Sequence, residues 1–375
     1  MAGVYIHIPF CARKCVYCDF YSVGARLADW PRLVSALLDE ARVRVPELTG
    51  AGAKCDTLYI GGGTPSLLPP GEFGRLAAGV LSLTGPVSEF TVEVNPDDVT
   101  GELADAWRGA GVDRVSMGVQ SLVDGELRAI GRRHDSRRAR EAYDTLRRRF
   151  GNVSLDLMFG LPGQTRRSLR ESVAGVIDMR PEHVSVYSLM YEERTALTRM
   201  RDSGRIDETP EEESAAMFAD ITEMLDAAGY EQYEISNYSL PGFRSRHNSA
   251  YWSGEPYVGL GPAAHSYDGL RTRRANAPDV RAYISRWLDG GGDAVTVETL
   301  TDDELREEMI MTRLRTRGGI PLEEFRRRFG AVAFRSLLSA SRRWVAAGLM
   351  EERDGTLALS RRGVMVSDEI IVSLF

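Results

Sequence analysis

The sequence predicts an α/β fold in which parallel strands alternate with helices, followed by a smaller C-terminal α+β unit. Short apolar runs rich in β-branched and aromatic residues recur through the first half of the chain, with helical stretches between them. This alternation is typical of parallel βαβ units. Towards the C-terminus, helical patterns lead into a hairpin-like pair around Asp354 and Gly355.

Six strands are expected in the first half, near residues 4–8, 57–60, 90–94, 114–118, 153–158 and 183–187. Helices are expected between them, near residues 31–45, 70–83, 100–110, 136–150 and 165–179. Pro31, Pro70 and Thr100 are suitable residues for helix starts. Six strands of this kind favour a partial (β/α)6 barrel over a sandwich.

The second half divides less clearly. A helix is expected near residues 210–228, then an irregular aromatic stretch over 230–267, and a linker or loop at 290–293. From about Thr301 the chain has the pattern of a winged-helix-like unit: helices followed by a hairpin over 348–359. The predicted domains are therefore a barrel over 1–200, a barrel extension over 201–295 and the C-terminal domain over 296–375.

Composition limits the classes of function. The 375 residues carry a net charge of −7, with ordinary hydrophobic (43%) and charged (27%) fractions. The acidic balance argues against a nucleic-acid partner, so we expect the winged-helix-like unit to serve packing or partner docking. Four cysteines in this length predict no disulfide framework, and no apolar run reaches the length of a membrane span. A cytoplasmic location follows, since clustered thiols must stay reduced.

Cys11, Cys15 and Cys18 form a CxxxCxxC triplet directly after the first strand. Three thiolates can hold three corners of a [4Fe–4S] cluster and leave one iron open. A structural zinc site is the alternative, but zinc requires four ligands and only His7, on the preceding strand, could be the fourth. Cys55 is isolated and is expected to be a small buried residue.

Polar residues follow or end the other predicted strands. The glycine-rich run that includes Gly62, Gly63 and Thr64 follows the second strand, Glu93 lies on the third, and Asp156 on the fifth. In a β/α barrel, sites form where the carboxyl ends of the strands meet. A carboxylate buried in an apolar strand is costly unless it is paired or hydrogen-bonded. The two acidic residues therefore either face a polar barrel mouth or form structural ion pairs, with Arg132 or another cation.

The cysteine triplet resembles that of radical S-adenosylmethionine (SAM) proteins, in which the open iron chelates SAM. Further motifs, among them YIHIPF, GGGTPS and DLMFGLP, resemble the oxygen-independent coproporphyrinogen III oxidase family over most of the chain. The resemblance implies a [4Fe–4S] cluster on the three cysteines. It also implies SAM contacts by Tyr5, Tyr17, Gly62, Gly63, Thr64, Glu93, Gln120, Arg132 and Asp156.

Two departures point to one branch of that family. The dehydrogenases carry another cysteine two positions after the third, where this chain has Phe20, and they have a longer N-terminal segment. Both features resemble the heme chaperone branch, HemW. The run RHNSAYW matches the HNxxYW motif of that branch, so the resemblance implies that His247 ligates heme beside Tyr251 and Trp252. His265, in a glycine- and proline-rich context, is the alternative ligand.

The resemblance implies a protein that binds heme and delivers it to acceptor hemoproteins, with membrane-bound respiratory proteins among the acceptors and peripheral membrane contact during delivery. Two enzymatic classes stay open: oxidative decarboxylation of coproporphyrinogen III by a 5′-deoxyadenosyl radical, and radical SAM methyl transfer. Phe20 and the short N-terminus favour the chaperone. The sequence predicts no oligomeric state.

Overall fold

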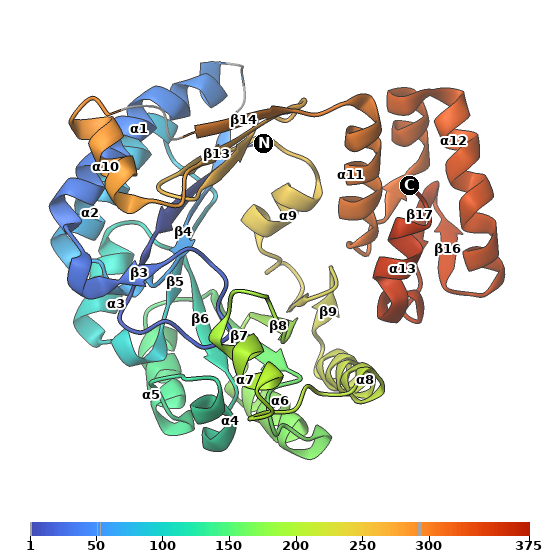
Figure 1. The fold of residues 1–375 in the computed structure, drawn as a ribbon, viewed down its shortest axis with the longest axis horizontal. Coiled ribbons are helices and arrows are strands. Elements are labelled where there is room, and N and C mark those ends of the chain that lie inside the picture. The colour runs from blue at the N-terminus through green and yellow to red at the C-terminus, as the bar shows by residue number, and fades with distance from the viewer. Residues whose placement is uncertain (1, 51, 53, 292–294) are drawn as a thin grey trace.

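Parallel strands form the centre of a large sheet in the computed structural model (Figure 1). Within the described residues (2–50, 52, 54–291 and 295–375), this sheet has twelve strands in the order β14-β13-β12-β11-β1-β4-β5-β6-β7-β8-β10-β9. The six predicted strands are adjacent and parallel, which confirms the partial (β/α)6 barrel. They are β1 (Ala2–Ile8), β4 (Cys55–Gly62), β5 (Glu89–Val94), β6 (Arg114–Gln120), β7 (Val153–Phe159) and β8 (His183–Ser188).

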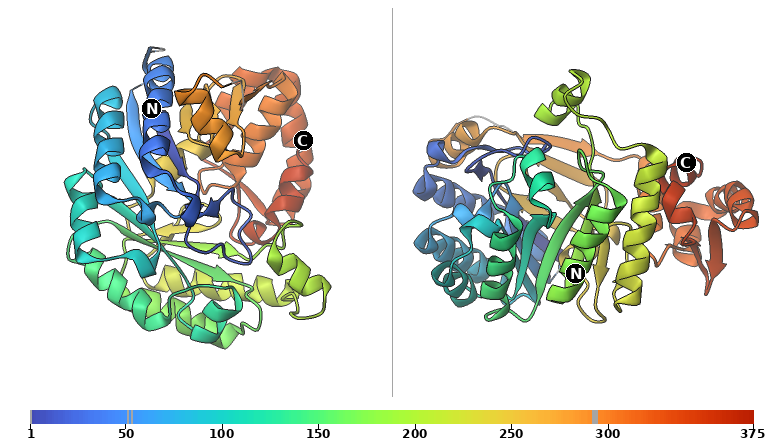
Figure 2. Two further views of the ribbon diagram at one scale, coloured as in Figure 1. Left: turned by 60° about the vertical axis from the view of Figure 1, so that its left-hand side comes forward. Right: turned by 90° about the horizontal axis from the view of Figure 1, so that it is seen from below.

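The predicted helices cover the outer side of these strands (Figure 2). Their starts follow from local sequence: the side chain of Thr100 accepts a hydrogen bond from the Leu103 N–H, and that of Thr165 caps the helix that follows it. A short further helix, α4 (Asp124–Ala129), was not expected. The covering helices are α1 (Trp30–Gly50), α2 (Pro70–Thr84), α3 (Gly101–Gly109), α5 (Ser136–Arg147) and α6 (Arg166–Met179).

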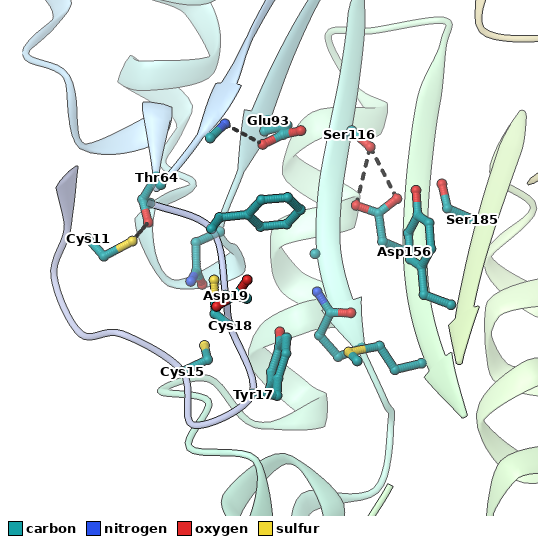
Figure 3. Close-up of a pocket in the computed structure, with 18 of the residues that line it drawn as sticks. Cys11, Cys15, Tyr17, Cys18, Asp19, Thr64, Glu93, Ser116, Asp156 and Ser185 are labelled. Atoms are coloured by element: carbon teal, nitrogen blue, oxygen red, sulfur yellow. Dashed lines mark hydrogen bonds between the residues drawn. The ribbon is translucent and has the colours of Figure 1, made fainter. Parts of the chain in front are cut away.

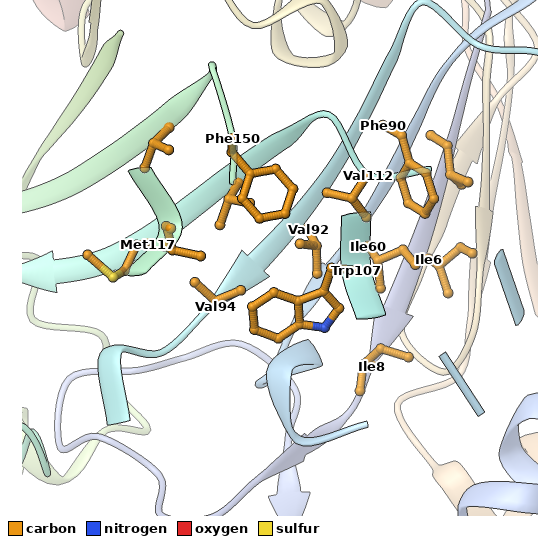
Figure 4. Packing of buried hydrophobic residues seen from close by; sticks show 14 of the residues in the cluster. Ile6, Ile8, Ile60, Phe90, Val92, Val94, Trp107, Val112, Met117 and Phe150 are labelled. Carbon is orange, nitrogen blue, oxygen red and sulfur yellow. The ribbon is translucent and has the colours of Figure 1, made fainter. Parts of the chain in front are cut away.

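The main hydrophobic core lies between the strands and these helices (Figure 4). Ile6, Ile60 and Val92 belong to adjacent strands, and Trp107 of α3 joins the same cluster; all four are fully buried. Because each buried methylene contributes about 0.8 kcal/mol, this core fixes the strands firmly relative to one another. The loops at their carboxyl ends are therefore held in defined positions.

The second half of the chain extends both edges of the sheet. Here the expectation of an irregular stretch over 230–267 is wrong, because short strands and a helix occupy much of it. Strands of two to five residues are too short to show a two-residue period. The short strands of the second half that join the large sheet are β9 (Glu231–Gln232), β10 (Asn237–Ser239), β11 (Tyr257–Leu260), β12 (His265–Tyr267), β13 (Thr272–Asn276) and β14 (Val295–Thr299). The helices are α7 (Ala196–Asp202), α8 (Glu211–Ala227), α9 (Arg246–Trp252) and α10 (Val280–Leu288).

The C-terminal unit has the expected winged-helix-like form. Helix α11 (Asp302–Leu314) precedes α12 (Leu322–Ala346), which breaks at Gly330, where φ is 83°. Strands β15 (Ile320–Pro321), β17 (Thr356–Leu359) and β16 (Met350–Arg353) form a small sheet beside α13 (Ser367–Val372). The unit has its own hydrophobic core, in which Phe325 is fully buried.

The predicted domain boundaries at 200 and 295 stay predictions. The second one falls at the start of β14, a strand of the large sheet. The predicted linker over 290–293 includes Gly290 and Gly291, which follow α10, whereas 292 and 293 lie outside the described residues. Across the described part of the chain, no helix is both long enough and apolar enough to cross a membrane.

Candidate functional site

A cavity of about 610 Å³ opens where the cysteine loop faces the carboxyl ends of β4 to β8 (Figure 3). Five different strand ends and one loop contribute to it, as expected for a barrel site. It brings together every residue predicted to bind the cluster or SAM except Tyr5. These residues are Cys11, Cys15, Tyr17, Cys18, Gly62, Gly63, Thr64, Glu93, Gln120, Arg132 and Asp156.

Cys11 ends the short strand β2 (Phe10–Cys11), Cys15 and Cys18 lie on the loop that follows it, and all three are free, half-buried thiols. The Thr64 hydroxyl donates to the Cys11 Sγ at 3.4 Å. The Arg132 guanidinium lies 3.6 Å from the Cys15 Sγ. Cys55 is buried on β4 and does not line the cavity. A hydroxyl therefore faces the Cys11 thiol and a cation faces the Cys15 thiol.

The described residues around the thiols offer no complete zinc site. Among the described residues, no group of three His, Cys, Asp or Glu side chains is placed to hold a single metal ion. Zinc needs its ligands to converge on one ion, whereas each cysteine of a cubane binds a different iron. His7 is committed elsewhere, because its ring is hydrogen-bonded to the Tyr5 hydroxyl (3.0 Å) and the Tyr21 carbonyl (2.9 Å). His7 is therefore not free to act as the fourth zinc ligand beside the three thiols.

The glycine-rich loop after β4 depends on its lack of side chains. Gly62 has a φ of 108°, and a Cβ there would lie 2.5 Å from the His7 Nδ1. A Cβ on Gly63 would lie 2.7 Å from the Phe10 carbonyl oxygen. Only glycine fits such a close approach of backbone to a neighbouring strand and loop. The Gly62 and Gly63 N–H groups donate to Glu93 and to the Ile8 carbonyl, so the loop lines the cavity with its backbone held in place.

Glu93 and Asp156 are held by neutral donors. The Tyr59 hydroxyl (2.8 Å) and the Gly62 N–H (3.0 Å) donate to Glu93, and the Ser116 hydroxyl donates to Asp156 at 3.2 Å. Burial raises the pKa of Glu93 to about 7 and that of Asp156 to about 6. Such raised values are typical of functional carboxyls.

The structural alternative for these carboxyls, an ion pair with Arg132, is not found in the described residues. Arg132 instead donates to the Gly118 carbonyl and faces Cys15. The cation whose charge lowers the pKa of both carboxyls is Arg114, which is 1% exposed at the start of β6. Arg114 forms none of the described ion pairs, so neutral donors alone hold the two carboxyls by hydrogen bonds.

Gln120 lies at an irregularity in the strand pairing, at the end of β6. It has a φ of 67°, a left-handed conformation that side chains other than glycine rarely adopt. The pairing of β6 with β7 shifts register between Gly118 and Gln120. Bulges of this kind re-aim side chains near functional sites, and here the amide of Gln120 lines the cavity.

Sequence reasoning missed several residues that line this cavity, including Tyr59, Arg114, Ser116 and Ser185. Strand periodicity contains a signal for two of them. Arg114, Ser116, Gly118 and Gln120 alternate along β6, so they point to the same face of the sheet. An arginine and a serine on that face, in line with the predicted Gln120, could have been assigned to the barrel interior.

Tyr5 and His247 lie away from this cavity. Tyr5 lines a neighbouring cavity. His247, on α9, is 2% exposed, and burial lowers its pKa to about 3. Its Nδ1 is hydrogen-bonded to the Thr57 hydroxyl (2.7 Å) and its Nε2 to the Tyr251 hydroxyl (2.8 Å). Both ring nitrogens are therefore engaged, and ligation of heme iron by His247 would require one of these bonds to break.

Comparisons with known proteins agree with this geometry. Residues 5–174 match the radical SAM superfamily, and residues 300–366 match the HemN C-terminal domain. The coproporphyrinogen III oxidase HemN of Escherichia coli has the same fold, with a TM-score of 0.84 and 21% identity over 100% of this chain and 89% of that one. The barrel and its cysteine loop are thus those of a radical SAM protein.

Similar sequences define the family more narrowly. The heme chaperone HemW of Bacillus subtilis is 35% identical over 99% of this chain and 98% of its own length. That of Mycobacterium tuberculosis is 33% identical over 99% and 94%. A mitochondrial radical S-adenosyl methionine domain-containing protein 1 of Bos taurus is 33% identical over 98% and 84%. The chain belongs to the heme chaperone HemW family.

Proposed function

We propose that this protein binds heme, a [4Fe–4S] cluster and SAM, and delivers heme to acceptor hemoproteins. The observation that carries the proposal is its similarity, over nearly the whole length, to proteins named heme chaperone HemW. We further propose that it acts in the cytoplasm, where its four free cysteines stay reduced. Membrane-bound respiratory proteins, reached by peripheral contact with the membrane, are the acceptors that we expect.

Membership of the radical SAM superfamily implies a [4Fe–4S] cluster and SAM. We assign the cluster to Cys11, Cys15 and Cys18, because these thiols are unpaired, belong to one loop and line one cavity. When bound, such a cluster supplies an open iron that chelates the amino and carboxyl groups of SAM. The cavity beside the thiols supplies the remaining contacts.

We assign SAM to the residues that face this cavity. The backbone of residues 62–64 forms part of the cavity wall, and Glu93 and Asp156 accept hydrogen bonds from amino and hydroxyl groups. Arg132 provides a charge-assisted donor for a carboxylate, beside the amide of Gln120 and the ring of Tyr17. Tyr5 acts through His7, the ring against which the glycine loop packs.

The alternative function is oxidative decarboxylation of coproporphyrinogen III. Its support is the fold shared with HemN, which at 21% identity does not define a reaction. Phe20 occupies the position at which the dehydrogenases carry a further cysteine, and its side chain is 71% exposed. No thiol of the described chain replaces that cysteine near the loop.

The test uses full-length protein reconstituted anaerobically. We expect about four irons per chain, heme binding detected by its Soret band, and transfer of heme to an apo-hemoprotein such as apomyoglobin. Cys11→Ser should abolish the cluster absorbance, whereas Cys55→Ser, a buried thiol outside the cavity, should retain it. Turnover of coproporphyrinogen III with SAM to protoporphyrinogen, or absence of heme binding and transfer, would refute the proposal.

A further inference from the structure

A second cavity, also of about 610 Å³, lies beside the first. It is bounded by β11, β12 and the cysteine loop on one side and by α11 of the C-terminal unit on the other. Asp19 and Phe20, which follow the third cysteine, line both cavities. Its volume is in the range of sites that enclose one small-molecule ligand. Of the residues assigned to the cluster or to SAM, Tyr5 alone lines this cavity.

Aromatic rings form one wall of the second cavity. Tyr251 and Trp252 come from α9, Tyr257 from β11 and Tyr267 from β12. The rings of Tyr251 and Tyr257 meet edge to face at 4.6 Å, and those of Tyr257 and Tyr267 lie 6.5 Å apart. Buried Met309 of α11 lies among the residues that line the cavity. Such walls suit a flat, largely apolar ligand.

Cations from three different elements reach the same cavity. Arg273 of β13 forms an ion pair with Glu308 at 2.6 Å. Arg313 of α11 donates to a backbone carbonyl at 3.2 Å. Arg328 of α12 is exposed, lies near the Tyr267 hydroxyl and forms none of the described ion pairs. Arg328 is therefore the cation best placed to bind a carboxylate of a ligand.

His265 is the accessible imidazole of this cavity. Among the chain's five histidines, all within the described residues, it alone is exposed and has no hydrogen bond to its ring. His7 also lines the cavity, but both its nitrogens are engaged. His247 is separated from it by Tyr251. An accessible imidazole is a common axial ligand of heme iron.

We propose that the second cavity is the heme site, with His265 as an axial ligand and Arg328 as the partner of a propionate. The inference rests on the proposed function and names its binding site. Heme combines the features that the cavity matches: a flat apolar macrocycle, two carboxylates and an iron that takes axial ligands. The shared residues Asp19 and Phe20 place this heme directly beside the cluster and SAM cavity.

The test titrates hemin and metal-free protoporphyrin IX into full-length protein with its cluster reconstituted. His265→Gly should weaken hemin binding by roughly tenfold or more, since losing even an outer partner of a metal ligand costs that much, and should leave protoporphyrin IX binding unchanged. Added imidazole should restore the axial-ligand signature in the Soret and electron paramagnetic resonance spectra. Cluster absorbance and SAM affinity should not change, because the thiols lie in the other cavity.

Reversing the charge of Arg328 tests the proposed propionate contact independently of the axial ligand. Arg328→Glu should weaken binding of both hemin and protoporphyrin IX by about tenfold, as expected for a lost charge-assisted bond. It should not affect heme dimethyl ester, which lacks the carboxylates. Arg327→Glu is the matched control: it is exposed on the same helix and does not line the cavity.

The outcomes distinguish a wrong heme site from a wrong proposed function. Hemin binding that is unaffected by His265→Gly but lost in a folded His247→Ala variant would refute this site and favour the HNxxYW histidine as ligand. Equal effects of Arg328→Glu and Arg327→Glu would refute the role of Arg328. A wild-type protein that binds no heme at all would refute the proposed function and, with it, this inference.

Discussion

Replacing Glu93 with glutamine tests whether the ionised carboxyl lowers the free energy of unfolding. The Glu93 carboxyl is half-buried beside Asp156, and its partial removal from water raises its pKa from 4.5 to about 7. Between these two values the folded protein keeps a proton that the unfolded chain has lost. The free energy of unfolding therefore falls as pH rises from about 4.5 to about 7 and levels off above it.

The size of the effect follows from this difference in pKa. At 1.36 kcal/mol for each pH unit, ionised Glu93 costs the folded state about 3 kcal/mol at pH 8. Glutamine does not ionise, so Glu93→Gln removes this cost. Its amide offers only one oxygen to the two donors, Tyr59 and Gly62, which costs about 1 kcal/mol. We expect a net gain of about 2 kcal/mol at pH 8 and almost none at pH 5.

The assay is thermal unfolding of the cluster-free protein at both pH values, together with SAM binding by calorimetry after reconstitution. The midpoint at pH 8 should rise by roughly 4 °C or more, while SAM affinity falls by about tenfold, as for a lost hydrogen bond to a charged group. Glu223→Gln, an exposed change on α8, is the control and should alter neither. Equal destabilisation by Glu93→Gln at pH 5 and pH 8 would show that the pKa of Glu93 is not raised in the folded protein, and would refute this prediction.

Three further changes test the geometry of the two cavities. Gly62→Ala places a Cβ 2.5 Å from the His7 ring at a φ of 108°, so calorimetry should find weaker SAM binding and a lower unfolding midpoint; unchanged affinity would contradict the role of the loop. Gln120→Gly relieves a φ of 67° and should stabilise the protein by about 1 kcal/mol in urea unfolding while weakening SAM binding; a loss of stability would contradict the strain. Tyr251→Phe leaves the buried Nε2 of His247 unpaired and should cost about 1–3 kcal/mol with the cluster absorbance intact; a neutral effect would contradict that hydrogen bond.

The sequence predicted the barrel and its main site because both depend on local patterns. The βα alternation determines which strand ends meet, and the motifs at those ends contain Cys11, Gly62, Glu93 and Asp156. A parallel barrel brings such ends together whatever lies elsewhere in the chain. Hence the residues of the first cavity could be assembled in advance, although their individual roles stay predictions.

What could not be predicted depends on contacts between distant segments. Arg114 begins a strand and carries a charge of a kind that is almost never fully buried unless it is paired, but the sheet closes around it and leaves it 1% exposed. The second cavity needs β11, β12 and α11 side by side, and β11 pairs with β1, more than 250 positions away. The sequence could not show that the ring of His247 is already engaged. Thr57, whose hydroxyl is hydrogen-bonded to the His247 Nδ1, lies on a strand far away in the sequence.

A chain of side chains joins the two cavities and gives His247 a role without contact to iron. Tyr59 donates to Glu93 and stacks on His247 at 5.0 Å, and His247 is hydrogen-bonded to Tyr251, which forms part of the wall of the second cavity against Tyr257. Removing the imidazole frees the Tyr251 ring and disturbs that wall, so a loss of heme affinity in a His247 variant does not by itself make His247 the ligand. Imidazole rescue and the axial-ligand spectrum distinguish the two roles, since only a true ligand changes the iron's coordination.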